Sequence, residues 1–203
     1  TPNTYPAVIV QKMIEPEVSG AAITNYQGSH GLVELVRGLG TPLEDGEVVP
    51  EFYLLNGGQI KDTRVPSQQV ETSVNPMNGA ERQKAVDISQ PFFDSSEIER
   101  FMDQLRSENM DVKFAYKRGT FYIIDAFEHG NGNPFNSTET SLEGIRVSNG
   151  AITGTVGREV SYSNDTLPPG QYGDALIASR GGYTSRDAQL ARHHEKPAVF
   201  SFN

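Results

Sequence analysis

The amino-acid sequence predicts an α+β fold in which an antiparallel sheet packs against a helix. Short apolar or alternating runs, bounded by glycine and proline, recur along the 203 residues and indicate strands. Residues 94–109 carry the apolar spacing and the capping residues of an amphipathic helix. Residues 111–128 form two alternating runs around a Lys-Arg-Gly turn, which is typical of a β-hairpin.

The N-terminal part of the chain is rich in strand signals. Residues 7–13 (AVIVQKM) form an apolar run that ends in polar residues, so we expect a buried strand there. Residues 18–24 and 32–36 continue the same character. Residues 38–52 are dense in glycine, proline and acid, which predicts a loop with special backbone angles. Residues 56–93 have no regular period, and no element is assigned to them.

The predicted helix begins with a capping box. Asp94 caps the first turn, and Glu97 supplies the reciprocal carboxylate. The apolar side chains at i, i+3, i+4 and i+7 are Ile98, Phe101, Met102 and Leu105. We expect this stripe to pack in the core.

The sequence predicts two domains. Residues 129–140 lose all periodicity and gain asparagine, glycine and proline, so we interpret them as a linker between a first domain at 1–128 and a second at 141–203. In the second domain, short strands punctuated by glycine precede a strand, a glycine turn and a helix over residues 174–196.

Composition excludes several classes of protein. The chain has 17 basic and 26 acidic residues, and its net charge of -9 repels a phosphate backbone, so we expect no nucleic-acid partner. It has no cysteine, which excludes disulfides, thiolate zinc sites and cysteine nucleophiles. The apolar runs are far too short to span a bilayer. We therefore expect no membrane partner and a cytoplasmic location.

The stretch GGYTS, residues 181–185, predicts a helix start whose backbone N–H groups face an anion. Arg186 follows directly, at the position where a phosphate-carrying group is expected. A guanidinium stays protonated and cannot accept a phosphoryl group, although its planar donors can bind one.

Four motifs, in order along the chain, resemble the phosphoenolpyruvate synthase and pyruvate phosphate dikinase family, whose relatives include the rifampicin phosphotransferases. The motifs are VIVQKMIEPEVSGAAIT, VELVRGLGTPLEDGEVVPEFY, DVKFAY with GTFYIIDAFE, and GGYTSRDAQLARHHEKPAV. The resemblance implies an ATP-grasp-like half-domain at 1–128, the linker at 129–140, and a shortened phosphohistidine-like swivelling β/β/α domain at 141–203.

The residues that would carry the family's chemistry differ here. The resemblance implies that Lys113 replaces a magnesium-binding glutamate, Asp125 a magnesium-binding glutamine, Phe127 an arginine that holds the ATP phosphates, and Arg186 the phosphohistidine. Magnesium requires oxygen ligands, and an ammonium has no lone pair to donate. We therefore expect no metal site and no catalytic residue.

Two side-chain hypotheses accompany this interpretation. Lys113 and Asp125 lie on neighbouring predicted strands, so we expect a cross-strand ion pair in place of the metal, the alternative being two unrelated surface charges. His193 or His194 could replace the phosphoryl carrier, but seven helical residues place His193 about 10.5 Å from Arg186. The alternative is two solvent-facing histidines near the end of a helix.

The resemblance also places nucleotide contacts at Gln11, Lys12, Met13 and Glu34. Backbone contacts to adenine survive changes of side chain, so ATP bound without metal-dependent turnover stays open as a cofactor. The alternative at residues 10–13 is a buried strand with an ordinary apolar Met13.

Two functions follow from these observations. The first is a catalytically degenerate relative of the ATP-dependent phosphotransferases, which acts as a structural, interaction or nucleotide-binding module. The second is a fragment or subunit of an active phosphotransferase, whose missing lobe is supplied by upstream sequence or by another protein chain.

Overall fold

A computed structural model describes residues 10, 12–26, 30–66, 68–87, 90–105, 109–128, 144–148, 176–178, 181–193 and 198–201. The first part of the chain contains β1 (Val18–Tyr26), β2 (His30–Arg37), α1 (Thr41–Glu44), β3 (Glu51–Asn56), β4 (Gln59–Arg64), β5 (Gln68–Val74), β6 (Glu81–Asp87), α2 (Ser95–Leu105), β7 (Met110–Lys117) and β8 (Thr120–Glu128). The second part contains β9 (Gly144–Ser148), β10 (Leu176–Ala178), α3 (Arg186–His193) and β11 (Ala198–Ser201).

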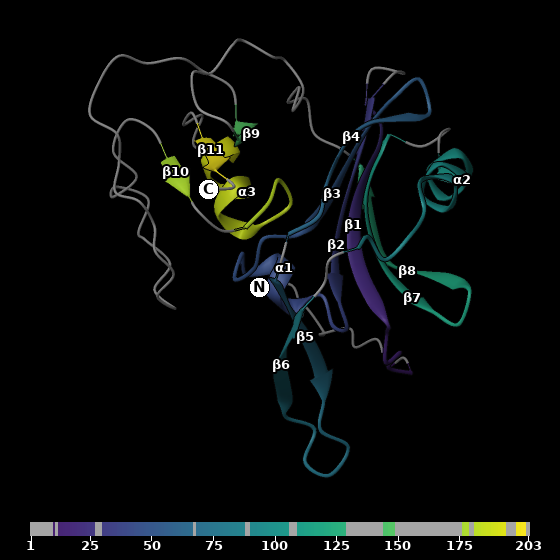
Figure 1. Cartoon of the computed structure of the whole chain (residues 1–203), viewed down its shortest axis with the longest axis vertical. Helices are drawn as coiled ribbons and strands as arrows, with labels where there is room; N and C mark the ends of the chain where they lie inside the picture. Colours follow the sequence, from purple (N-terminus) through teal and green to yellow (C-terminus); the bar gives the residue numbers. More distant parts are fainter. Residues whose placement is uncertain are drawn as a thin grey trace, which may run out of the picture.

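The centre of the fold is a six-stranded antiparallel sheet in the order β4-β3-β2-β1-β7-β8. A smaller sheet has the order β10-β11-β9, and β5 pairs with β6 as a separate hairpin. Figure 1 shows α2 on one side of the large sheet, and α1 with α3 on the other. The described residues thus form a mostly antiparallel structure with few helices, which is compatible with the expected α+β class.

The expected strands at 18–24 and 32–36 are confirmed as β1 and β2. The expected buried strand at 7–13 is wrong for the residues that the structure describes there. Val10 is 91% exposed and Met13 is 58% exposed, and neither lies in a strand. Proline has no N–H to donate to a sheet, and the first strand begins only after Pro16, at the fully buried Val18.

The predicted helix is confirmed as α2, with Ile98, Phe101 and Met102 buried. The Asp94 backbone N–H lies 3.4 Å from Glu97 Oε2, as the capping box requires. The ring of Phe101 stacks on that of Phe121 with centroids 4.2 Å apart, so the helix packs directly on the β7–β8 hairpin. Apolar side chains of the central strands complete this core.

The predicted hairpin is confirmed as β7 and β8. Its turn places Arg118 at φ 49° and Gly119 at φ 82°, and two consecutive positive φ angles match the twist of a two-residue hairpin. The register runs from Lys113 opposite Asp125 to Phe114 opposite Ile123, so one extra residue forms a bulge in β8.

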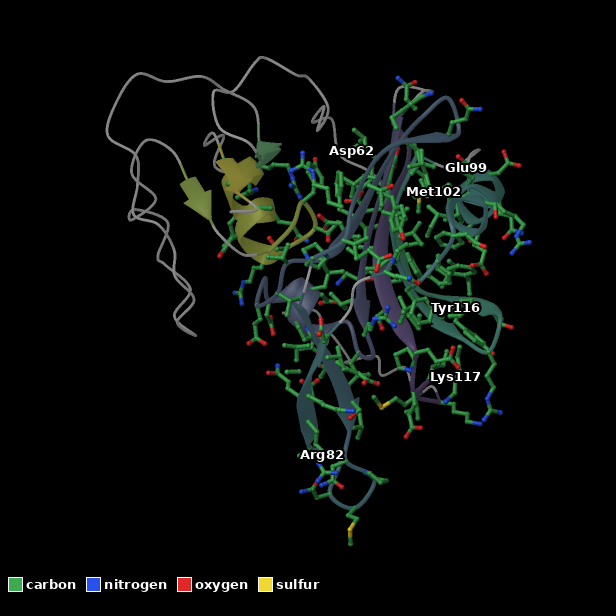
Figure 2. All side chains as sticks on the ribbon, in the orientation of Figure 1. Asp62, Arg82, Glu99, Met102, Tyr116 and Lys117 are labelled. Atoms are coloured by element: carbon green, nitrogen blue, oxygen red, sulfur yellow. The ribbon has the colours of Figure 1, made fainter. Side chains whose placement is uncertain are left out.

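The segment 56–93, to which no element was assigned, contains β4 and the β5–β6 hairpin. Figure 1 shows this hairpin extending away from the large sheet. The pattern failed to reveal β5 and β6 because both strands are mostly polar and their burial does not alternate. The described side chains of β5 are mostly half-buried and Thr72 is fully buried, whereas those of β6 are largely exposed, as Figure 2 shows for Arg82. The loop predicted at 38–52 has the expected special angles at Gly38 and Gly46. It also contains the short helix α1, and its last two residues are the start of β3.

A buried carboxylate connects β3 to the segment that precedes α2. Glu51 is 1% exposed, accepts the Tyr53 hydroxyl, and accepts the Phe92 N–H at 3.0 and 3.2 Å from its two oxygens. Burial raises the pKa of this carboxyl, while the hydrogen bonds from Tyr53 and Phe92 oppose the rise.

In the second part, the predicted strand, glycine turn and helix are confirmed by β10, the turn at Gly181 and α3. The predicted linker at 129–140 and His194 lie outside the described residues, and the domain boundaries stay predictions. Among the helices that the structure describes, none has the length and apolar character needed to cross a membrane.

Candidate functional site

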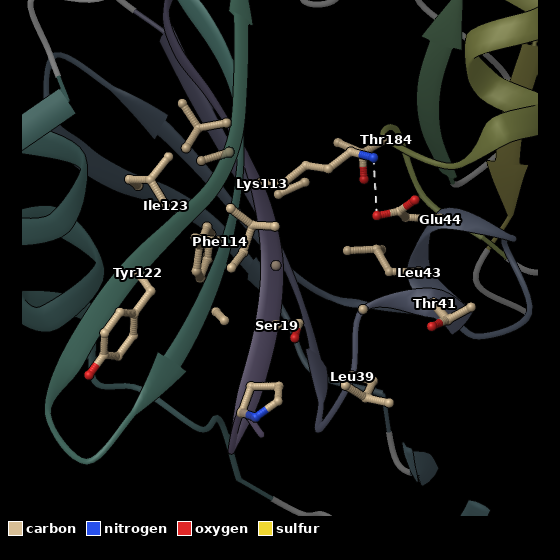
Figure 3. A pocket seen from close by; sticks show the side chains of 18 of the residues that line it. Ser19, Leu39, Thr41, Leu43, Glu44, Lys113, Phe114, Tyr122, Ile123 and Thr184 are labelled. Atoms are coloured by element: carbon tan, nitrogen blue, oxygen red, sulfur yellow. Dashed lines mark ion pairs between the residues drawn. The ribbon is translucent and has the colours of Figure 1, made fainter. Parts of the chain in front are cut away.

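A cavity of about 500 Å³ lies where β1, β7 and β8 meet α1 and the residues around α3. Its size falls within the range of about 300–1,000 Å³ that is usual for small-molecule sites. Figure 3 shows Ser19 and Lys113 on the strands, Leu43 and Glu44 on the α1 side, and Thr184 across the opening.

The alternation of side chains along the strands explains which residues reach the cavity. Phe114 belongs to the core that packs under α2. Successive side chains of a strand point to opposite faces, so Lys113 points to the other face, where it lines the cavity. Ala21 lies directly opposite Lys113 in the antiparallel register and lines the cavity as well.

Large apolar side chains gather on the open side of the cavity. Met13 is 58% exposed, and the side chains from β8 that join it are Tyr122, Ile123, Ile124 and Phe127. These side chains form an exposed apolar cluster beside the cavity. The bulge in β8 helps to form it, because it brings Ile123 and Ile124 to the same rim.

Charged groups of both signs line the same cavity. The cations are Lys12, Lys113 and Arg192, and the acids are Glu44, Glu81 and Asp111. Lys113 Nζ lies 3.1 Å from Glu44 Oε1, and Figure 3 marks this ion pair. Both partners are partly exposed, so the pair contributes little stability by itself. It holds the ammonium at the cavity wall.

The expected ion pair between Lys113 and Asp125 is wrong. The two residues are opposite each other in the register, as predicted, but the ammonium pairs with Glu44 on α1 instead. Asp125 Oδ1 accepts the N–H of Ala126 at 2.9 Å, and Asp125 is not among the described residues that line the cavity. Lys113 pairs with Glu44 because α1 lies next to the sheet at this point. The pattern of residues along a strand does not show where α1 lies.

Glu34 lies on β2 between Val33 and Leu35, which face the α2 core, so its side chain points to the opposite face. It is fully buried. Its carboxylate accepts the N–H of Tyr183 at 2.5 Å, the N–H of Thr184 at 2.8 Å and the Thr184 hydroxyl at 2.5 Å. Burial raises the pKa of Glu34, and these hydrogen bonds oppose the rise.

The turn before α3 therefore does present N–H groups to an anion, as GGYTS predicted, and the anion is a carboxylate of the same chain. Arg186 is the first residue of α3, and it does not line the cavity. It lies near enough to Asp45 and Asp187 to lower the pKa of both, although burial raises the pKa of each overall.

Arg192, near the end of α3, reaches back to the turn. Its Nη1 donates to the Tyr183 carbonyl at 2.8 Å, and its guanidinium lies 4.0 Å from the centre of the Tyr183 ring. Burial lowers the pKa of Arg192, while Tyr183, Asp111 and Glu34 favour the charged form. Sequence patterns had marked only the turn and Arg186, so they missed Arg192 as a residue of the cavity.

The structure brings some of the predicted site residues together. Lys12, Met13 and Lys113 line the cavity. Glu34 is hydrogen-bonded to Thr184, which lines the cavity, but Glu34 itself does not line the cavity. Gln11 is outside the described residues. Their role in nucleotide binding stays a prediction. Sequence reasoning missed several polar residues of the cavity, among them Glu44, Gln189 and Arg192.

Comparison with known proteins gives two distant similarities. The chain is 26% identical over 195 residues to a probable phosphoenolpyruvate synthase of Methanocaldococcus jannaschii, an alignment that covers 84% of this chain and 16% of that protein. It is 24% identical over 237 residues to a probable phosphoenolpyruvate synthase of Archaeoglobus fulgidus, covering 95% of this chain and 31% of that protein. These similarities support a relationship to phosphoenolpyruvate synthases. No protein-family model matches the chain.

Proposed function

We propose that the chain is a degenerate relative of the phosphoenolpyruvate synthases that binds a nucleotide without transferring its phosphate. In this proposal the six-stranded sheet corresponds to half of an ATP-grasp domain, and the second part to a shortened swivelling domain. The observation that carries the proposal is the cavity, which combines the rim residues Lys12 and Met13 with the inward-facing ammonium of Lys113.

The cavity suits the two halves of a nucleotide. The apolar rim of Met13 and the β8 side chains offers a surface for a purine ring. Lys12, Lys113 and Arg192 offer positive charge to phosphates. Among the described residues, Lys113 forms its ion pair with the exposed Glu44, so a phosphate can replace that carboxylate as its partner.

Lys113 and three residues outside the cavity argue against transfer of the phosphate. An ammonium at position 113 cannot ligate magnesium, and Asp125 is turned to its own neighbouring N–H. The N–H groups of the turn before α3 already donate to Glu34, so they are not available to a phosphate. Arg186 cannot carry a phosphoryl group. Each of these features blocks a different part of metal-dependent phosphoryl transfer.

Isothermal titration with ATP tests the proposal. We expect binding that does not require magnesium, and an affinity about 5–10-fold weaker in Lys113→Ala, because one charge-assisted contact of about 1–1.5 kcal/mol is lost. Lys84→Ala is the matched control, since Lys84 is exposed on β6 and does not line the cavity. Absence of binding at millimolar ATP would refute nucleotide binding.

A second candidate is a subunit of an active phosphotransferase whose other lobe lies in a different chain. The exposed apolar rim on β8 favours it, because a second lobe would cover these side chains. The relatives are much longer than this chain, which spans 16% and 31% of them. Co-purification with a stable partner that restores ATP-dependent labelling of either chain would select this candidate.

A further inference from the structure

The contact between Glu34 and the turn before α3 joins parts of the chain that are 149 and 150 residues apart. It brings three donors onto one carboxylate that is fully buried. Hydrogen bonds to a charged acceptor are about twice as strong as those between neutral groups. This contact is therefore a candidate for holding the second part of the chain on the sheet.

The other hydrogen-bonding groups of the turn that the structure shows are paired within the turn and α3. Ser185 Oγ donates to the Gly182 carbonyl at 2.8 Å, and Gln189 Nε2 donates to the Thr184 carbonyl at 2.8 Å. Arg192 satisfies the Tyr183 carbonyl. The carbonyl groups of the turn thus find partners within the turn and α3, whereas the N–H groups of Tyr183 and Thr184 point outward and need an acceptor.

The turn packs tightly against the Glu34 carboxylate. A Cβ placed on Gly182 would overlap Glu34 Oε1 and would lie 2.8 Å from the Pro50 ring. Gly181 N–H donates to the Val48 carbonyl at 3.0 Å and fixes the chain just before the turn. Glycine at 182 is thus the residue that lets the turn approach the carboxylate this closely.

We propose that Glu34 is a positioning residue. Its carboxylate serves as a built-in anion that holds residues 181–193 against the sheet, so that Thr184, Gln189 and Arg192 form one wall of the cavity before any ligand arrives. The docking contact stands by itself, whereas its effect on nucleotide affinity rests on the function proposed above.

Hydrogen exchange on the whole chain, without ligand, tests this inference. In Glu34→Ala we expect the amides of 181–193 to exchange about tenfold faster or more, because the charged acceptor is lost. Peptides from α2 and β7 should exchange as in the parent chain. Thr184→Val removes only the hydroxyl donor, so we expect a smaller acceleration, about two- to fivefold, at the same peptides.

Glu51→Ala is the matched control, because Glu51 is also a buried carboxylate that accepts backbone and hydroxyl donors, but in a different place. It should accelerate exchange near Phe92 and leave 181–193 unchanged. Parent-like exchange of 181–193 in a folded Glu34→Ala would overturn the inference, as would equal acceleration in Glu51→Ala. If Glu34→Ala unfolds globally, parent-like exchange in Thr184→Val would overturn it instead.

The two proposals can fail separately. If the parent chain binds ATP, Glu34→Ala should weaken binding several-fold through disorder of one wall. If no variant binds ATP, the exchange difference at 181–193 still decides whether Glu34 holds the segment.

Discussion

At the scale of single residues, buried carboxylates distinguish this chain from an ordinary sheet protein. Glu34 and Glu51 are each less than 2% exposed, and each accepts backbone N–H groups from a distant segment. Burial raises the pKa of both. Burial of each carboxylate costs desolvation energy. Its hydrogen bonds connect two distant parts of the chain.

The raised pKa of Glu51 predicts a pH dependence of stability. A carboxyl whose pKa is higher in the folded chain than its ordinary value of 4.5 binds more protons when folded. The unfolding free energy should thus fall as the pH rises from 4.5 through the raised pKa, and the contribution should be flat below that window.

Glu51→Gln keeps an acceptor for Phe92 N–H but removes the ionisation, so the slope of unfolding free energy against pH should become less negative. Urea unfolding at several pH values measures this slope. Glu128→Gln, at an exposed position on β8, is the control. An unchanged slope in Glu51→Gln would show that Glu51 does not titrate in this window.

At the scale of elements, α2 and the β7–β8 hairpin were predictable because their signals are local. The capping box, the apolar stripe and the turn glycine each lie within one short segment, and Asp94, Phe101 and Gly119 all lie where the pattern placed them. The strand expected at 7–13 is wrong at Val10 and Met13, because an apolar run alone does not show whether it pairs with a sheet.

The stack of Phe101 on Phe121 predicts that α2 and the hairpin unfold together. Phe101→Ala should lower the free energy of unfolding by about 3–5 kcal/mol, since it removes a buried ring from the centre of an aromatic cluster. Chemical denaturation measures the loss. Arg100→Ala, one residue away on the exposed face, should change stability by less than about 0.5 kcal/mol. Similar losses in the two variants would contradict this packing.

At the scale of the whole molecule, the partners of Lys113 and Glu34 could not be predicted from the sequence, because they come from distant segments of the chain. The pairing of Lys113 with Glu44 depends on how α1 meets the sheet. The role of Glu34 depends on a turn 149 residues later. Both residues were singled out from the sequence, but with other partners, because residue spacing along one strand carries no information about a segment that arrives from elsewhere.

The proposed loss of phosphoryl transfer involves several separate sites, so restoring one should not restore activity. With magnesium and ATP labelled at the γ-phosphate, we expect no label on the purified chain or on Arg186→His, because Lys113 still occupies the expected metal position. Acid-labile label on the parent chain would contradict the proposed degeneracy. Label on Arg186→His alone would show that the carrier was the only missing group.

The position of β8 has a practical consequence for handling the protein. Within the part of the chain that the structure describes, β8 pairs on one side only, with β7, and the other side is a free strand edge with apolar neighbours. Such an edge is a template for fibril growth. The bulge between Ile123 and Asp125 interrupts the regular spacing of β8, so we expect it to hinder the pairing of another strand on this edge.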